Sequence, residues 1–389
     1  MSSATMPQPA AGEWRDSKRY LWLFSIAVMG LPLLGYGLYQ QTGWSIFWWY
    51  GPIFVYGVIP IFDWLVGTDT NNPPESEVQA LVADRYYRWA VYLAVPLQFF
   101  TFVWGSWMAV NGGLLWHQWL GLMISVGGVS GVSINTAHEL GHKTDKFERW
   151  LARIALAPVA YGHFYVEHNR GHHVRVATPA DPASARFGES FYRFLPRTVF
   201  GSVKSAWEIE KQRLARSGAG PWTWQNDNLQ AWAMTVVLFA GMIYWLGWLA
   251  LPFMIGQAIY GFSLLEAVNY LEHYGLCRQQ GPDGRYERCQ PHHSWNSNNT
   301  VTNIFLYHLQ RHSDHHANPT RSYQALRHFK DCPQLPSGYA GMILLAYIPP
   351  LWFRVMDPKV VSHHGGDMRR ANIRPDLRDE VIAKYAAAA

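Results

Sequence analysis

The sequence predicts an all-α membrane protein with six transmembrane helices, arranged as three hairpins, and a cytoplasmic helical cap. Three stretches contain no Asp, Glu, Lys or Arg, namely residues 20–62, 89–138 and 228–265. Each is about twice the roughly 20 residues that a helix needs to cross a bilayer, and each has a break near its middle. Only 15% of the residues are charged, against about 25% in an ordinary soluble domain. Buried helices of a large soluble protein are the alternative, which three uninterrupted stretches of this length disfavour.

The breaks divide the three stretches into six expected spans. Trp and Tyr gather beside the breaks, as at Trp48, Trp49 and Trp116, which is the placement of interfacial aromatic belts. The mean hydropathy of −0.11 does not contradict this assignment, because it averages apolar spans with polar segments and because the scale scores Trp and Tyr as polar. The 20 Trp, 21 Tyr and 19 Phe also exclude a disordered or collagen-like chain. We expect the spans at about 20–40, 44–65, 89–110, 114–136, 229–247 and 250–271.

Lys and Arg set the expected orientation. Arg15, Lys18 and Arg19 precede the first span, and the turns inside the hairpins contain no basic residue. The long segments 137–228 and 272–355 hold most of the others. Because positive residues stay inside, we expect both termini and both long segments in the cytoplasm. The formal net charge of +5 then reflects topology or, alternatively, a docking face for an acidic partner.

The remaining parts of the chain are less regular. Residues 1–19 are expected to be a flexible cytoplasmic tail, because the first 14 lack the apolar core of a signal peptide. Residues 20–355 form one integral-membrane domain, and 356–389 a polar C-terminal tail. Residues 332–353 are uncharged but contain four Pro, so an interfacial or re-entrant piece is favoured over a seventh span. The three Cys include no C-x-x-C pair, which disfavours a disulfide framework and a Cys-ligated metal.

Nine of the 17 His fall into four clusters. On a helix, residues three or four apart share a face, so His138 with His142, His168 with His172, and His312 with His315 and His316 can converge. Nine imidazoles exceed what one ion can bind, whereas two ions with four or five each account for the number. The proposed ligands are His138, His142, His168, His172, His173, His273, His312, His315 and His316.

These clusters are expected at one membrane face, since His138 ends the fourth span, His273 follows the sixth, and the others lie in cytoplasmic segments. Imidazole suits Zn, Cu, Fe and Ni. Soluble di-iron bundles use Glu-x-x-His twice, and only Glu139-x-x-His142 has that form here. A site made almost wholly of His beside a hydrocarbon-facing cavity favours redox iron, although zinc remains possible on chemistry alone.

Several polar side chains flank the proposed ligands. They can orient the imidazoles by accepting the second ring N–H, or the acids can form ion pairs at helix ends. These residues are Glu139, Glu167, Asn269, Glu272 and Asp314. The other eight His are assigned ordinary roles: His117 interfacial, His363 and His364 solvated, and His163, His308 and His328 structural, while His292 and His293 are the remaining candidates to contact the site.

Four motifs carry a resemblance to a known family. They are HELGHK at 138–143, EHNRGHH at 167–173, NYLEHYG at 269–275 and LQRHSDHHA at 309–317. At these residues the sequence resembles the integral-membrane alkane 1-monooxygenases (alkane ω-hydroxylases), which belong with fatty-acid desaturases and hydroxylases to a His-rich membrane di-iron family. The likeness spans roughly residues 15–355, and the last two motifs are the narrower ones.

The resemblance implies a six-helix bundle with two iron ions held by the nine His. It implies O2-dependent hydroxylation of the terminal methyl of medium- to long-chain n-alkanes to 1-alkanols, in the inner membrane of a bacterium. It also implies electrons from rubredoxin, with rubredoxin reductase upstream; since this chain has no C-x-x-C pair, that donor is a separate chain or domain. No nucleic-acid partner is expected.

An alkane offers no hydrogen bond, so cavity shape must select it. We expect lateral access from the bilayer, with the methyl toward the metal and Trp49, Phe54, Leu264 and Leu265 as lining candidates. A desaturase/hydroxylase or a methyl-aromatic (xylene-type) monooxygenase is the nearer alternative. Two remote ones are a zinc metalloprotease with Glu139 as base, which leaves seven clustered His unexplained, and a metal transporter. A transporter needs ionisable groups within the bilayer, and the spans lack them until Asp63 and Glu266.

Overall fold

The computed structural model of the protein describes residues 16–386, which are helical apart from turns and isolated β-bridges. Six helices are long and apolar enough to cross a membrane, which confirms the predicted all-α fold with six spans and indicates a multi-pass membrane protein. They are Leu23–Thr42 (α1, α2), Ser45–Val66 (α3, α4), Arg85–Asn111 (α6, α7), Trp116–Gly141 (α8), Asp227–Leu246 (α13) and Ala250–His273 (α14). Of the predicted 1–19 tail, residues 1–15 lie outside the described residues, as does the closing Ala run from 387.

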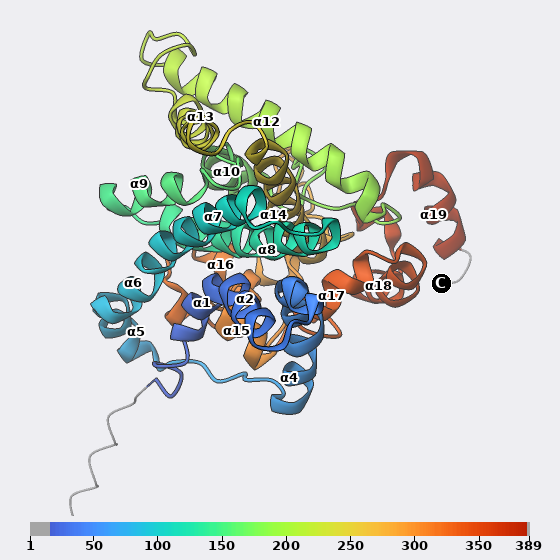
Figure 1. Cartoon of the computed structure of the whole chain (residues 1–389). Helices are drawn as coiled ribbons and strands as arrows, with labels where there is room; N and C mark the ends of the chain where they lie inside the picture. The colour runs from blue at the N-terminus through green and yellow to red at the C-terminus, as the bar shows by residue number, and fades with distance from the viewer. Residues whose placement is uncertain (1–15, 387–389) are drawn as a thin grey trace, which may run out of the picture.

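Further helices lie in the segments between and after these spans (Figure 1). Within the spans, α1 is Leu23–Ala27, α2 Leu31–Thr42, α3 Tyr50–Ile53, α4 Ile59–Val66, α6 Arg85–Tyr92 and α7 Ala94–Asn111. Outside them lie α5 (Glu75–Ala83), α9 (Lys146–Ala155), α10 (Phe164–Glu167), α11 (His173–Arg175), α12 (Phe191–Ala215), α15 (Thr300–Phe305), α16 (His312–Ala317), α17 (Tyr339–Ala346), α18 (Pro349–His363) and α19 (Arg378–Ala386).

The hairpin turns lie where the sequence predicts breaks. Helix α2 ends at Gly43 with φ of 71° and α13 ends at Gly247 with φ of 79°, a backbone conformation that favours glycine. Helix α8 begins after Leu115, whose N–H donates to the Gln118 side chain at 2.9 Å. Each charge-free stretch therefore folds back on itself instead of crossing as one long helix.

The centre of the bundle is the parallel pair α8 and α14. Glycines allow the two backbones to approach: a Cβ on Gly127 would lie 2.7 Å from the Gln257 carbonyl oxygen, and one on Gly131 would lie 2.8 Å from that of Gly261. Small residues serve this purpose in membrane helix packing. Ser130 donates to Gln257 at 2.6 Å across the same contact. Because both helices run in one direction, their C-terminal ends, and with them His138 and His273, lie at the same end of the bundle.

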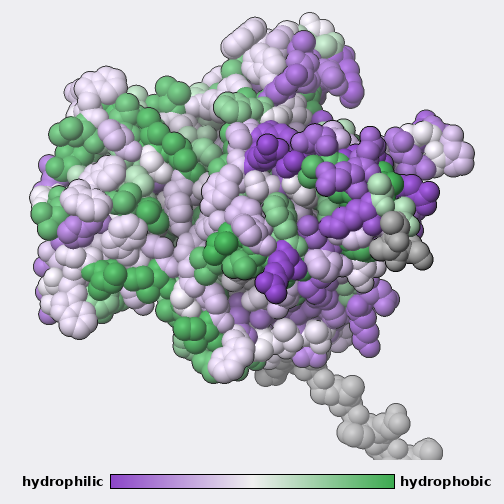
Figure 2. Space-filling model, turned by 90° about the vertical axis from the view of Figure 1, so that its right-hand side faces the viewer, coloured by the Kyte–Doolittle hydropathy of each residue, from purple (hydrophilic) through white to green (hydrophobic). Residues whose placement is uncertain are grey.

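The C-terminal part of the chain is folded onto the bundle. Helices α17 and α18 meet at a bend of 119°, the geometry of a broken or re-entrant segment rather than a straight seventh span. Met356 and Val360 of α18 are buried, and so are Met368 and Ile373 beyond it, because apolar residues recur among the charges of this polar segment. Figure 2 shows hydrophobic side chains over one side of the molecule and hydrophilic ones gathered on the other.

Candidate metal centre

Four elements position the nine clustered histidines. His138 lies in the last turn of α8, with His142 directly after it, and His273 ends α14. His168–His172 is a π-helical turn that continues into α11 at His173. π-Helical turns are rare and occur often at functional sites. The short helix α16 supplies His312, His315 and His316.

The nine imidazoles form two groups. In each group, one ring nitrogen from every member lies within 4.8 Å of the others. The five-histidine group contains His138, His142, His168, His173 and His315, and the four-histidine group contains His172, His273, His312 and His316.

One sequence-based pairing is wrong. His168 and His172 belong to different groups, and His168 instead pairs with His173, their Nε2 atoms lying 3.1 Å apart. In a regular α-helix residues five apart point about 140° away from each other. The π-helical turn, with its i→i+5 repeat, brings them to one face.

The spacing of the nitrogen atoms fits ligands of a common ion. Neighbouring Nε2 atoms are 2.9 Å apart for His138 and His315, and 3.1 Å for His142 and His168. In the second group His312 and His316 are 2.8 Å apart. Imidazole nitrogens bind metals such as zinc at about 2.0–2.1 Å, so ligands at right angles would be about 3.0 Å apart. A neutral imidazole has one N–H, and hydrogen bonds alone do not account for so many converging Nε2 atoms.

The clustered histidines outside the spans are kept neutral. Burial, and then repulsion between the imidazoles, holds the pKa of His142, His168 and His315 well below the usual value. The pKa values of His173, His312 and His316 are lowered in the same way. A neutral imidazole has the free lone pair that a metal requires.

Asp181 is a site residue that the sequence reasoning missed. Its carboxylate lies 2.9 Å from Nδ1 of His172 and accepts from Ser184 at 2.6 Å. Burial opposes ionisation of Asp181, but attraction to His172 and these hydrogen bonds prevail and lower its pKa to about 2. The charged Asp181 fixes the N–H of His172 at Nδ1, so Nε2, which has no other partner in the described residues, points into the four-histidine group. The sequence did contain one signal for this residue: an acidic side chain between Pro179 and Pro182 with no basic residue beside it.

Glu272 also contacts a ligand. One carboxylate oxygen is 3.1 Å from Nε2 of His312, and the other accepts from the Tyr339 hydroxyl at 2.8 Å. All three side chains are buried. Of the flanking residues proposed from sequence, Glu272 is the one that the described structure brings onto a ligand imidazole.

The other flanking residues have different partners. Glu139 pairs with Lys143 at 2.6 Å, Glu167 with Arg175 at 2.7 Å and Asp314 with Arg321 at 2.8 Å. Asn269 donates to Glu266 at 3.1 Å. Within residues 16–386 none of these four forms a hydrogen bond to a ligand imidazole. The three acids therefore form ion pairs, which was the alternative role considered for them, because each lies beside an Arg or Lys side chain.

Arg311 anchors the helix that carries three of the ligands. This buried guanidinium donates to the backbone carbonyls of Leu326 at 2.6 Å, Asp69 at 3.0 Å and Asn71 at 3.0 Å. Two loops, the one between α4 and α5 and the one at Leu326, are thereby held at the start of α16. Burial lowers the pKa of Arg311 to about 10, and the side chain stays cationic at neutral pH.

The other histidines have separate roles. His292 and His293 form a third group with Glu287, but His293 accepts from the Gln290 N–H at 2.9 Å and contacts Glu287 at 3.3 Å through its other nitrogen, so no lone pair is left for an ion. Nδ1 of His273 lies 3.4 Å from the His293 carbonyl oxygen. His364 was expected to be solvated and is buried, since its ring bonds to the carbonyl of Gly275 at 3.1 Å.

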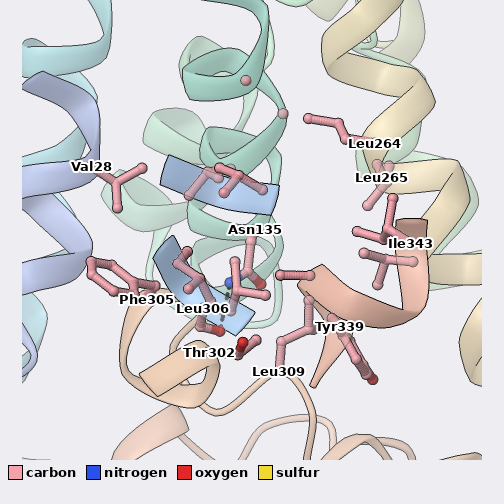
Figure 3. A pocket seen from close by; sticks show the side chains of 17 residues that line it. Val28, Asn135, Leu264, Leu265, Thr302, Phe305, Leu306, Leu309, Tyr339 and Ile343 are labelled. Carbon is pink, nitrogen blue, oxygen red and sulfur yellow. Dashed lines mark hydrogen bonds between the residues drawn. The ribbon is translucent and has the colours of Figure 1, made fainter. Parts of the chain in front are cut away.

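An apolar cavity of about 80 Å³ adjoins the centre. Leu264 and Leu265, two of the sequence candidates, line it (Figure 3). Asn135 and Leu309, which also line it, lie three residues before His138 and His312 respectively. The wall of this cavity, called the inner cavity below, also includes Tyr339, whose hydroxyl donates to Glu272, the residue in contact with His312.

A second apolar cavity of about 430 Å³, the outer cavity, lies between the first two spans. Phe54 lines it. Trp49 lines neither cavity; its indole instead lies over Gly121, where a Cβ would come within 2.8 Å of the ring. Gly121 precedes Gly128, a residue of the inner cavity wall, by two turns of α8.

The sequence of this chain is similar to those of known proteins. The family model described as fatty acid desaturase matches residues 114–346. An alkane 1-monooxygenase from Pseudomonas putida is 47% identical over 97% of this chain and 94% of its own length. The alkane 1-monooxygenase of Acinetobacter baylyi is 48% identical over 95% of this chain and 91% of its own. The xylene/toluene monooxygenase hydroxylase component of Pseudomonas putida is 32% identical over 61% of this chain and 63% of its own.

The likeness to the alkane enzymes therefore extends along nearly the whole chain, whereas the likeness to the aromatic enzyme is partial. The chain belongs to the alkane 1-monooxygenases, a branch of the membrane family that the fatty acid desaturase model describes.

Proposed function

We propose that the protein hydroxylates the terminal methyl of medium- to long-chain n-alkanes at a di-iron centre held by the nine histidines. The observation that carries the proposal is the juxtaposition of two converging imidazole groups with an apolar cavity. The near-full-length relatives named alkane 1-monooxygenase support the same substrate class.

Both atoms of one oxygen molecule must be accounted for in the reaction. One oxygen atom is inserted into the methyl C–H bond to give the primary alcohol, and the other leaves as water after uptake of two electrons and two protons. Two bound iron ions supply the oxygen activation and the oxidising power for the C–H bond. Iron fits the donor set, because neutral buried imidazoles suit a redox metal as well as zinc, while zinc cannot exchange electrons.

The protein's own residues bind and align the chain. Polar groups in the inner cavity wall are already paired: Asn135 donates to the Leu306 carbonyl at 2.7 Å, and the Thr302 hydroxyl donates to Asp63. An alkane therefore meets no unpaired polar group there, and water gains little by remaining. Selection then depends on length and width, with the methyl held beside His138 and His312.

The electron donor is proposed to be rubredoxin, docking on the cytoplasmic side of a bacterial inner membrane. Exposed basic residues lie where two loops meet near the end of α14: Gln279 donates to the Arg370 carbonyl at 2.9 Å, and the Asn372 N–H donates to that of Gly275 at 3.2 Å. Arg288 and Arg370 are exposed in these loops, and Arg378 is exposed at the start of α19. Gly275 is two residues from His273, so an acidic donor bound here would be close to the four-histidine group.

Purified protein in lipid nanodiscs tests the proposal. We expect two iron per chain and formation of 1-octanol from octane, O2, rubredoxin, rubredoxin reductase and NADH. One zinc per chain without oxygen uptake would contradict it. p-Xylene should be added in a parallel reaction, because the partial likeness to the xylene/toluene enzyme favours a methyl-aromatic as the second candidate substrate.

A further inference from the structure

The inner and outer cavities are separated by a thin partition. Three residues line both cavities, namely Val28, Ile59 and Phe305. Val28 and Ile59 are 3% and 6% exposed, and as β-branched side chains on helices they have essentially one χ1 rotamer. Phe305 is only partly buried. It is therefore the one member of the partition whose side chain has room to turn.

The outer cavity opens sideways. Among its lining residues, Phe24 and Leu34 on the first span are each 51% exposed, and Phe62 on the second is 50% exposed. These side chains belong to spans that cross the bilayer, so the opening faces lipid tails. An alkane dissolved in the membrane can reach this cavity without crossing a polar layer.

The backbone that carries Phe305 is fixed at both ends. At the start of α15, the Thr302 N–H donates to Asp63 at 2.9 Å and its hydroxyl donates to the same carboxylate. Immediately after Phe305, the Leu306 carbonyl accepts from Asn135 at 2.7 Å. The chain then turns through Tyr307 and His308 with φ of 50° and 54°, a left-handed conformation that is uncommon in residues other than glycine. Opening by movement of the whole helix is therefore disfavoured.

The ring of Phe305 has soft contacts on the lipid side. It meets Phe54 edge-to-face at 5.4 Å between centroids, and Phe24 at 6.3 Å. On the inner side it faces the cavity in which Leu264, Leu265 and Ile343 lie opposite (Figure 3). Such edge contacts are weak and partly exposed rings rotate readily, so ring rotation can connect the two cavities while the backbone stays fixed.

We propose that Phe305 is a side-chain gate between a lipid-facing outer cavity and the inner cavity at the metal centre. This inference rests on the proposed function, because the molecule that passes the gate is the alkane substrate. A gate changes the rates of substrate binding and release by the same factor and leaves the equilibrium dissociation constant unchanged. A residue of the binding wall would change the equilibrium as well.

Exchange of radiolabelled dodecane on the full chain in nanodiscs measures this directly. Phe305→Trp should slow both association and dissociation by about tenfold, the low end of the range over which association rates vary among related variants. Phe305→Ala should accelerate both, with the dissociation constant within about twofold of wild type in each case, since equal factors cancel in the ratio of rates. Phe100→Trp is the matched control, because Phe100 is 56% exposed on α7 and lines neither cavity.

The outcomes separate the gate from the proposed function. If Phe305→Trp exchanges dodecane as fast as Phe100→Trp, or if its dissociation constant shifts along with one rate, the gate is refuted even where wild type forms 1-octanol. If wild type binds dodecane and shows the gated rates but oxidises no alkane, the gate stands and the proposed function fails. Iron content, which both Trp variants should retain, reports correct folding, and Phe305→Ala provides an independent second variant.

Discussion

The metal side and the substrate side of the centre are built in different ways. On the metal side, directional contacts prevail: Asp181 fixes His172, Glu272 contacts His312, and Arg311 ties two loops to α16. On the substrate side, the wall is a set of aliphatic and aromatic surfaces whose polar members are paired among themselves. A directional contact has few substitutes, whereas an apolar surface can be rebuilt in many ways. Substitutions on the two sides should therefore differ in size and in kind.

Loss of a ligand should have the largest effect. His315→Ala removes one nitrogen from the five-histidine group. We expect octanol formation to fall by more than about a hundredfold, beyond the roughly 10–100-fold cost of losing an outer partner, together with loss of iron. His117→Ala, in the first turn of α8 and at the end of that helix opposite His138, is the control. Equal iron content in the two variants would remove His315 from the ligand set.

Loss of an orienting carboxylate should come next. Asp181→Asn keeps the shape of the side chain but removes the charge that holds the His172 N–H, so we expect iron affinity to fall by about 10–100-fold. Competition with a chelator, read by iron analysis, measures the change. Glu208→Gln is the matched variant, because the Glu208 side chain is 45% exposed on α12 and pairs with Lys211 at 3.4 Å. Chelator curves that superimpose would show that Asp181 does not support the centre.

Reversing the charge of the loops proposed to face the electron donor should have a smaller effect on activity, and only at low salt. With Arg288→Glu and Arg370→Glu combined, KM for rubredoxin should rise by about five- to tenfold at low ionic strength, because complementary charges speed encounter. The difference should shrink above about 0.3 M salt, where the Debye length is only a few ångströms. Lys204→Glu on α12 is the control. A KM that stays equal to this control at every salt concentration would exclude the surface.

The smallest effect is expected at the far end of the substrate side. Trp49 lies over Gly121, about 10 Å along α8 from Gly128 in the inner cavity wall. Trp49→Ala should extend the space available to the chain, raising the rate with hexadecane relative to octane by about threefold while octane turnover changes little, since one apolar contact contributes little to discrimination. Product profiles from mixed alkanes measure the ratio. Trp44→Ala, an exposed indole nearby, should leave the profile as in wild type, and an unshifted Trp49→Ala profile would place the end of the channel elsewhere.

This contrast also explains what sequence could predict. Charge-free stretches and imidazole spacing are local patterns. The six helices and the convergence of His138 with His142 could therefore be predicted from the sequence. Asp181 was not, because it reaches His172 through a loop whose path depends on tertiary packing. The split between His168 and His172 depends on a single π-helical turn, which no residue type signals. Phe305 is one Phe among 19, and its place between two cavities is decided by contacts with spans far away in sequence.

Two neighbouring pairs of residues have a consequence for assembly of the centre. His172 and His173 are adjacent, yet they belong to different groups, and the same holds for His315 and His316. Consecutive Cα atoms are about 3.8 Å apart. Each pair therefore connects the two metal positions through a backbone link of fixed length. An ion bound in one group draws in a backbone segment that also carries ligands for the other. The two positions should therefore fill cooperatively, and a half-loaded protein should be a minor species during maturation.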